Sequence, residues 1–178
     1  MPKYSEETLN NQKKALAEAI GEIKKCRKSK SKTLDIGVNS YLNVFPEEIR
    51  ELTWLTNLSI GCADIRVLPE WIDELKNLQF LDISSNNKLR TLPASLANLK
   101  KLKKLIIDNT GLKSLPLFLG KMHSLELIEI GPYNFKEIPQ CILDLPRLKR
   151  IETRGYDTSH LPSLVKKQLE LDLKECLR

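Results

Sequence analysis

The segment "LKKLIIDNTGLKSLP", Leu102 to Pro116, contains a strand pattern and the turn that follows it. Leu105 and Ile107 are separated by one residue, which is the spacing of two side chains on the same face of a β-strand. A half-buried strand normally carries a polar side chain between such a pair. The residue at that position is Ile106. The meaning of this apolar residue depends on whether the segment recurs elsewhere in the chain.

The chain is built from a repeated unit. Leu-Pro or a close variant recurs with its prolines 23, 24, 23, 23 and 23 residues apart, at Pro46, Pro69, Pro93, Pro116, Pro139 and Pro162. Eleven or twelve residues before each proline, an apolar residue begins a strand-like pair. These pairs are Leu34/Ile36, Leu58/Ile60, Leu81/Ile83, Leu105/Ile107, Ile128/Ile130 and Ile151/Thr153. A fixed period of this length indicates a solenoid.

The repeat reads LxxLxLxxNxLxxLPxxIxxLxx and resembles the leucine-rich repeat family. Its LPxxI form is similar to that of bacterial leucine-rich-repeat effectors, of leptospiral-type repeat proteins and of the repeat segment of Roco proteins. The resemblance covers roughly residues 33–176 and implies an α/β solenoid, a horseshoe with a parallel concave sheet. A single unit cannot bury its apolar side, whereas stacked units share one core and align their strands about 4.8 Å apart.

One position of the repeat departs from the family pattern. In the family, an asparagine there hydrogen-bonds the backbone between neighbouring coils. In this sequence the position holds Asn39, Ala63, Asn86, Thr110, Tyr133 and Tyr156. We expect this bonding to be interrupted where asparagine is missing, with Thr110 as a partial substitute.

Residues 1–32 are expected to form an N-terminal helical cap and a basic loop. Leu16, Ile20 and Ile23 follow a helical spacing, with Leu9 one heptad earlier. Ser5 is a suitable N-cap because acidic residues follow it directly. The ends of a solenoid expose core residues, so we interpret this helix as a cap. A helix that docks a partner or lies on a membrane is the alternative.

Residues 33–178 are expected to form the repeats, with six clear units and a C-terminal capping strand. The strand is suggested by the alternation of Leu171 and Leu173 before Cys176. A closing helix through Val165 and Leu177 fits nearly as well. If the strand forms, its open edge could pair with a second copy of the chain.

The net charge of +6 is concentrated near the N-terminus. Residues 1–32 carry nine Lys or Arg and four Asp or Glu, and most of the basic residues lie in Lys24 to Lys32. This run lacks interleaved aromatic residues, so we interpret it as a solvated helix end. Attachment to nucleic acid or to an anionic membrane through this run is the weaker alternative.

The sequence contains no recognisable catalytic constellation. Phosphate-binding, nucleophile-elbow and zinc-protease motifs are absent, and the two histidines, His123 and His160, fall at loop positions. The four cysteines are far apart and are interpreted as buried free thiols. We expect no enzyme activity, no cofactor, no metal and no small-molecule substrate. The chain carries no signal-like or membrane-spanning run, so a cytoplasmic location is expected, with export by a signal-less route left open.

The concave face of the predicted sheet supplies the candidate binding residues. Phe80, Ile106 and Leu127 fall on three consecutive strands and could form one exposed apolar patch. Charged residues surround it in the predicted register: Asp82, Lys104, Asp108, Glu129, Arg150 and Glu152. An apolar centre with a polar rim is typical of a protein interface.

The favoured function is a non-enzymatic scaffold that binds a protein partner on this face. The largely acidic column of the sheet would select a partner with a basic surface. The resemblance to bacterial effectors implies an effector-like binding role without carrying over any activity. The alternative is a structural or self-associating module that forms a homodimer through its C-terminal edge or the concave patch.

Overall fold

The computed structural model describes residues 5–131 and 138–152. The expected capping strand or closing helix within 165–177 therefore lies outside the described residues, as do positions 133 and 156 of the asparagine column. Cys176 lies outside them as well.

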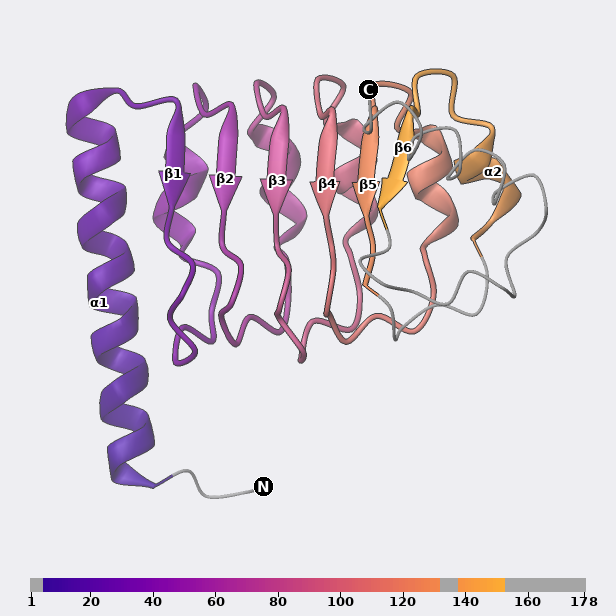
Figure 1. Ribbon diagram of the computed structural model, residues 1–178. Helices are drawn as coiled ribbons and strands as arrows, with labels where there is room; N and C mark the ends of the chain where they lie inside the picture. The colour runs from indigo at the N-terminus through magenta and orange to yellow at the C-terminus, as the bar shows by residue number, and fades with distance from the viewer. Residues whose placement is uncertain (1–4, 132–137, 153–178) are drawn as a thin grey trace, which may run out of the picture.

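One long helix precedes a regular series of strands and short helices (Figure 1). The helix is α1 (Glu6–Ser29). The strands are β1 (Thr33–Asp35), β2 (Asn57–Ser59), β3 (Phe80–Asp82), β4 (Lys104–Ile106), β5 (Leu127–Glu129) and β6 (Arg150–Glu152). Between them lie the 3₁₀-helices η1 (Glu47–Glu51), η2 (Glu70–Glu74), η3 (Ala94–Asn98) and η4 (Leu117–Lys121), and the one-turn helix α2 (Gln140–Leu143).

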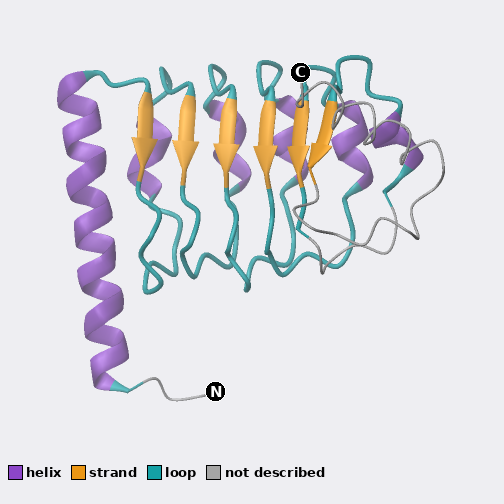
Figure 2. Ribbon diagram, viewed as in Figure 1, coloured by secondary structure: helices purple, strands orange, loops and turns teal. Residues whose placement is uncertain are grey.

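The six strands form one parallel sheet in the order β1-β2-β3-β4-β5-β6. The short helices lie behind this sheet (Figure 2). Each of them directly follows one of the repeated prolines. Proline suits the entry to a helix because its fixed φ is compatible and no amide hydrogen is needed there. The expected α/β solenoid with an N-terminal helix is confirmed. We call the sheet face opposite the short helices the concave face.

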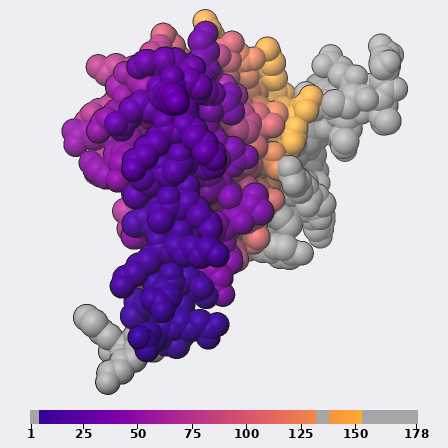
Figure 3. All heavy atoms as spheres, turned by 90° about the vertical axis from the view of Figure 1, so that its left-hand side faces the viewer, coloured from indigo at the N-terminus to yellow at the C-terminus, as the bar shows by residue number. Residues whose placement is uncertain are grey.

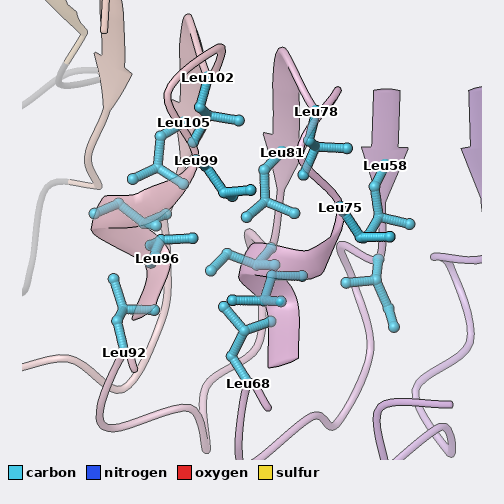
Figure 4. Packing of buried hydrophobic residues seen from close by; sticks show 14 of the residues in the cluster. Leu58, Leu68, Leu75, Leu78, Leu81, Leu92, Leu96, Leu99, Leu102 and Leu105 are labelled. Carbon is cyan, nitrogen blue, oxygen red and sulfur yellow. The ribbon is translucent and has the colours of Figure 1, made fainter. Parts of the chain in front are cut away.

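The core fills the space between the sheet and the short helices. Leu58, Leu81 and Leu105 occupy the same register position on neighbouring strands and are fully buried. Leucines from the return segments, including Leu75 and Leu99, pack beneath them (Figure 4). Burying each such side chain contributes roughly 2 kcal/mol. The strand-like pairs in the sequence therefore mark the core.

Helix α1 covers the first coil and lies across the end of the molecule (Figure 3). The predicted N-cap is confirmed, since the Ser5 hydroxyl accepts a hydrogen bond from the Thr8 amide. The predicted apolar stripe is only partly correct. The buried residues are Ala15, Ala19, Ile23 and Cys26, while Leu9 is 45% exposed. The small side chains of Ala15 and Ala19 allow the helix backbone to approach the edge of the sheet closely. These alanines are buried in place of Leu16 and Ile20, the residues that directly follow them, whereas Ile23 is buried as predicted.

The cysteines are not uniformly buried, contrary to the expectation. Cys26 is buried against the first coil, and this burial raises the pKa of its thiol. Cys62 and Cys141 are exposed. Cys62 lies in the turn after β2 with a φ of 54°, and Cys141 lies in α2, so neither belongs to a core column.

Asn86 makes the inter-coil hydrogen bonds expected of the asparagine position. Its side chain is fully buried, and its carbonyl oxygen accepts from the Ile65 amide of the preceding coil at 2.9 Å. Its amide nitrogen donates to the carbonyl oxygens of Ile60 and Ile83, each at 3.0 Å. The Thr110 hydroxyl donates a hydrogen bond to the Ile107 carbonyl oxygen of its own coil at 3.1 Å.

We expect Asn86→Ala to lower the free energy of unfolding by about 3 kcal/mol, because it leaves several buried backbone groups without partners. Asn39→Ala provides the matched control, since Asn39 occupies the same repeat position near the surface and bonds Glu18 and the Tyr41 amide. Urea denaturation measures both. Equal losses from the two variants would contradict this assignment.

In the first four repeats, the residue before the asparagine position adopts a left-handed backbone. In the described coils these residues are Val38, Cys62, Ser85 and Asn109, with φ between 52° and 63°. Val38 is the least suited because it is β-branched, and it is 86% exposed, so no packing compensates for the strain.

Val38→Asn should therefore stabilise the chain by about 1 kcal/mol, since asparagine tolerates this conformation better. Val67→Asn serves as the control, because Val67 is also exposed but has no positive φ. Thermal and chemical unfolding provide the comparison. An equal stabilisation of both variants would show that the cause is the replacement of an exposed apolar side chain by a polar one, and not the relief of backbone strain.

Candidate functional site

All the residues predicted to bind a partner lie on or next to β3 to β6. The parallel register aligns two rows across the concave face. The first row consists of Thr33, Asn57, Phe80, Lys104, Leu127 and Arg150. The second row consists of Asp35, Ser59, Asp82, Ile106, Glu129 and Glu152. The columns expected from the repeat are therefore present as rows of the sheet.

Ile106 does not have the exposure that the sequence suggested. Only 8% of its surface is exposed, so it is buried and not the open centre of a patch. Its chain neighbours Leu105 and Ile107 belong to the core cluster, whereas Ile106 does not. The residues paired with it on the flanking strands, Asp82 and Glu129, stand about 4.8 Å away on either side and limit the surface left to solvent.

Phe80 and Leu127 remain partly exposed on either side of Lys104. The ammonium group of Lys104 lies 5.7 Å from the centre of the Phe80 ring, within the range of a cation–π interaction. Leu127 lies between Lys104 and Arg150 in its row. The accessible apolar surface is therefore narrower than expected and is divided by a lysine.

Two aspartates of the second row have a local structural role. The Asp35 carboxylate accepts a hydrogen bond from the Gly37 amide at 3.0 Å, and the Asp82 carboxylate accepts one from the Ser84 amide at 2.9 Å. Such side-chain turns fix the backbone as it leaves a strand. These two aspartates of the second row therefore have a role in folding that does not depend on any partner.

The remaining predicted residues differ in accessibility. Arg150 and Glu152 form an ion pair at 2.8 Å and are half-buried. Glu129 is 1% exposed and presents almost no surface. One carboxylate oxygen of Asp108 is buried without a hydrogen-bond partner, and it occupies the space that a side chain at Gly131 would need. Position 131 is glycine because the stacked coil that carries Asp108 leaves no room for a side chain there.

The sequence did not indicate a hollow of about 530 Å³ between α1 and the end of β1. Glu18 and Glu22 line it from the helix, and Asp35 and Asn39 line it from the first coil. The Asn39 side-chain amide donates to Glu18 across it at 3.0 Å. These residues are distant in sequence and carry no motif, so only the docking of α1 brings them together.

Residues 5–131 and 138–152 contain neither a metal-binding cluster nor a membrane-spanning helix. No group of three or more His, Cys, Asp or Glu side chains in this part of the chain is arranged to hold a metal ion. Nor is any of the helices described there long and apolar enough to cross a membrane.

Comparison with solved structures supports the fold. A leucine-rich repeat protein of Leptospira interrogans is 29% identical over 72% of this chain, with a TM-score of 0.56. This chain covers 35% of that protein, so it spans about a third of its length. The ectodomain of the receptor kinase SOBIR1 from Arabidopsis thaliana is 22% identical, with a TM-score of 0.56, and the match covers 72% of this chain and 71% of that one. Toll from Drosophila, in its complex with Spätzle, is 18% identical, with a TM-score of 0.59 and coverage of 73% and 18%.

Comparison with protein families gives a match over nearly the whole chain. The matching family is described as a leucine-rich repeat region, and the match extends over residues 31–178. Proteins of this fold generally mediate protein–protein interactions and are typically not enzymes. The proline-marked period, the parallel sheet and this match agree, and the chain belongs to the leucine-rich repeat family.

Proposed function

We propose that this chain is a non-enzymatic scaffold that binds a protein partner through β3 to β6 of its concave face. The observation that carries the proposal is the placement of Phe80 and Leu127 in one row, on either side of Lys104. Both side chains are partly exposed on a sheet face that the short helices do not cover. Apolar anchors within a polar surround are the usual centre of a protein interface.

Ile106 supports this surface from within, because it is buried between the strands that carry the two anchors. The charged residues around the anchors would orient the partner. Asp82 and Glu152 are half-buried and can face a basic surface, while the buried Glu129 presents almost no surface to a partner. We therefore propose a partner whose contact surface combines an apolar centre with basic residues.

An effector-like role in bacteria is a further part of the proposal. It is supported by the LPxxI form of the repeats and by the similarity to the Leptospira protein. The Toll–Spätzle complex is a precedent for a repeat chain in a protein complex, although an identity of 18% concerns the fold alone. The cytoplasmic location expected from the sequence stays a prediction.

The double variant Phe80→Ala/Leu127→Ala should reduce partner capture at least tenfold, since truncating a central anchor typically costs about 1–2 kcal/mol or more. Quantitative affinity capture from bacterial and host-cell lysates provides the measurement. Val67→Ala/Leu117→Ala is the matched control, because these residues are exposed and apolar but lie outside the strands. Equal capture by the wild-type chain and both variants would contradict the proposal. Light scattering tests self-association. A concentration-dependent dimer of the wild-type chain that is absent in Phe80→Ala/Leu127→Ala would favour it instead.

Ile106→Ala should behave differently from the anchor variants. Its burial predicts a loss of about 2 kcal/mol in unfolding free energy, because a cavity replaces packed atoms. Urea denaturation of Ile106→Ala beside Leu127→Ala tests this, with a smaller loss expected for the half-buried Leu127. An Ile106→Ala variant of wild-type stability would restore Ile106 as a surface residue.

A further inference from the structure

Basic side chains line the edge of the sheet at which the strands begin. Each strand after β1 is preceded by a short turn that connects it to the helix behind the sheet. The turns that lead into β1, β3, β4 and β6 contribute eight exposed cations. These residues, which we call the basic edge, are Lys30, Lys32, Lys76, Lys100, Lys101, Lys103, Arg147 and Lys149. In Figure 1 this edge is the upper one, where the strand arrows start.

Contacts between coils show that these side chains are neighbours in space. The Lys101 ammonium group lies 2.7 Å from the side-chain oxygen of Asn77, in the preceding coil. Lys103 and Lys149 both reach Glu126, at 3.5 and 2.8 Å, from the coils on either side of it. With about 4.8 Å between strands, the edge extends for roughly 24 Å from β1 to β6. The cations therefore form a line along this edge that is interrupted at β2 and β5, whose entry turns contain no lysine or arginine.

The edge contains few acidic groups to balance these cations. In the described turns that lead into the six strands, the carboxylates are Glu126 and Asp144. Glu74, the last residue of η2, adjoins this edge, and its pKa is lowered mainly by the hydrogen bond from Arg50 and to a smaller extent by Lys76. Glu126 stays ionised because the hydrogen bond from Lys149, with Lys103 nearby, lowers its pKa. The whole chain, in contrast, carries 29 basic and 23 acidic residues. The edge therefore carries a net positive charge, in contrast to the more acidic concave face.

The edge also offers little exposed apolar or aromatic surface, since only Pro146 among its described apolar residues is exposed and Trp54 is half-buried. The large exposed hydrophobic residues of the described chain lie elsewhere: Leu9, Val38, Tyr41, Val44, Val67 and Leu117. Trp54, in the turn before β2, is half-buried beneath Lys30, with 3.8 Å from the ammonium nitrogen to the ring centre. Its indole nitrogen donates to the Ser31 carbonyl oxygen at 2.9 Å. Trp54 is therefore engaged within the protein.

These features distinguish between the possible anionic partners. Protein interfaces are depleted in lysine and depend on apolar anchors, which this edge lacks. Single-stranded nucleic acids are held largely by stacking on aromatic rings. Peripheral membrane binding commonly adds inserted apolar side chains to basic ones. A line of flexible lysines without such anchors matches a linear array of phosphates, which is the exposed backbone of a duplex.

We propose that the basic edge binds the phosphate backbone of double-stranded nucleic acid without reading its sequence. This surface is separate from the concave face, so one chain could hold a duplex and a protein partner together. In the sequence, most of the net positive charge falls within residues 1–32, because acidic residues of η1 and η2, such as Glu47 and Glu70, offset the lysines of the later turns. Folding separates these opposite charges onto different surfaces.

The test measures binding of a fluorescent duplex DNA of random sequence by anisotropy, over a series of salt concentrations. With about four phosphate contacts, affinity should fall roughly 100-fold between 50 and 200 mM salt. The variant Lys76→Gln/Lys100→Gln/Lys101→Gln/Lys103→Gln should bind at least tenfold more weakly at 50 mM salt and show a shallower salt slope. Thermal unfolding confirms that it is folded.

The matched control removes the same charge from other surfaces, as Lys13→Gln/Lys14→Gln/Arg90→Gln/Lys113→Gln, all at exposed positions. It should retain duplex affinity within about threefold. Parallel arms use phosphatidylserine-containing vesicles and polyglutamate at the same salt concentration. Equal losses in both variants, stronger binding to vesicles or polyglutamate than to the duplex, or no duplex binding by the wild-type chain at 50 mM salt would each overturn the proposal.

Discussion

The structure depends on the fact that one coil cannot bury its own apolar side chains. Each strand contains three residues, and a leucine such as Leu81 is fully buried only because the coils on both sides cover it. Stacking therefore supplies both the hydrophobic free energy and the parallel hydrogen bonds, and neither is available to an isolated unit. The same constraint requires a cover at the ends, which α1 provides for the first coil.

Stacking also turns a position in the repeat into a place in space. Residues one period apart align across the strands, so a residue type that recurs at one position becomes a row or a line. The concave face receives the aspartates and glutamates of one column, and the strand-entry turns receive the lysines. A 23-residue period thereby separates charges that are adjacent in the sequence. This separation is the physical reason why we propose two different partners for the two surfaces.

Side chains that look alike in the sequence have different roles once the coils are stacked. Asp35 and Asp82 satisfy backbone amides two residues further on, whereas Glu152 pairs with Arg150. Asn86 bonds the coil before it, while the Thr110 hydroxyl donates to the Ile107 carbonyl oxygen of its own coil. An acidic or polar column is thus partly a folding device. Only the part that remains accessible can recognise a partner.

The sequence by itself determined the repeat, the parallel strands, the short return segments and the N-terminal helix, because the leucine period and the prolines act locally and recur. It also determined the register of Phe80, Lys104 and Leu127, since a constant period leaves one alignment. Only the tertiary structure decided how much of each side chain stays exposed. Ile106 is apolar at an outward position, and its burial depends on the strands beside it, about which a local pattern contains no information. Contacts between residues far apart in the chain also determine which face of α1 packs on β1. The same kind of contact brings lysines from separate coils into one line.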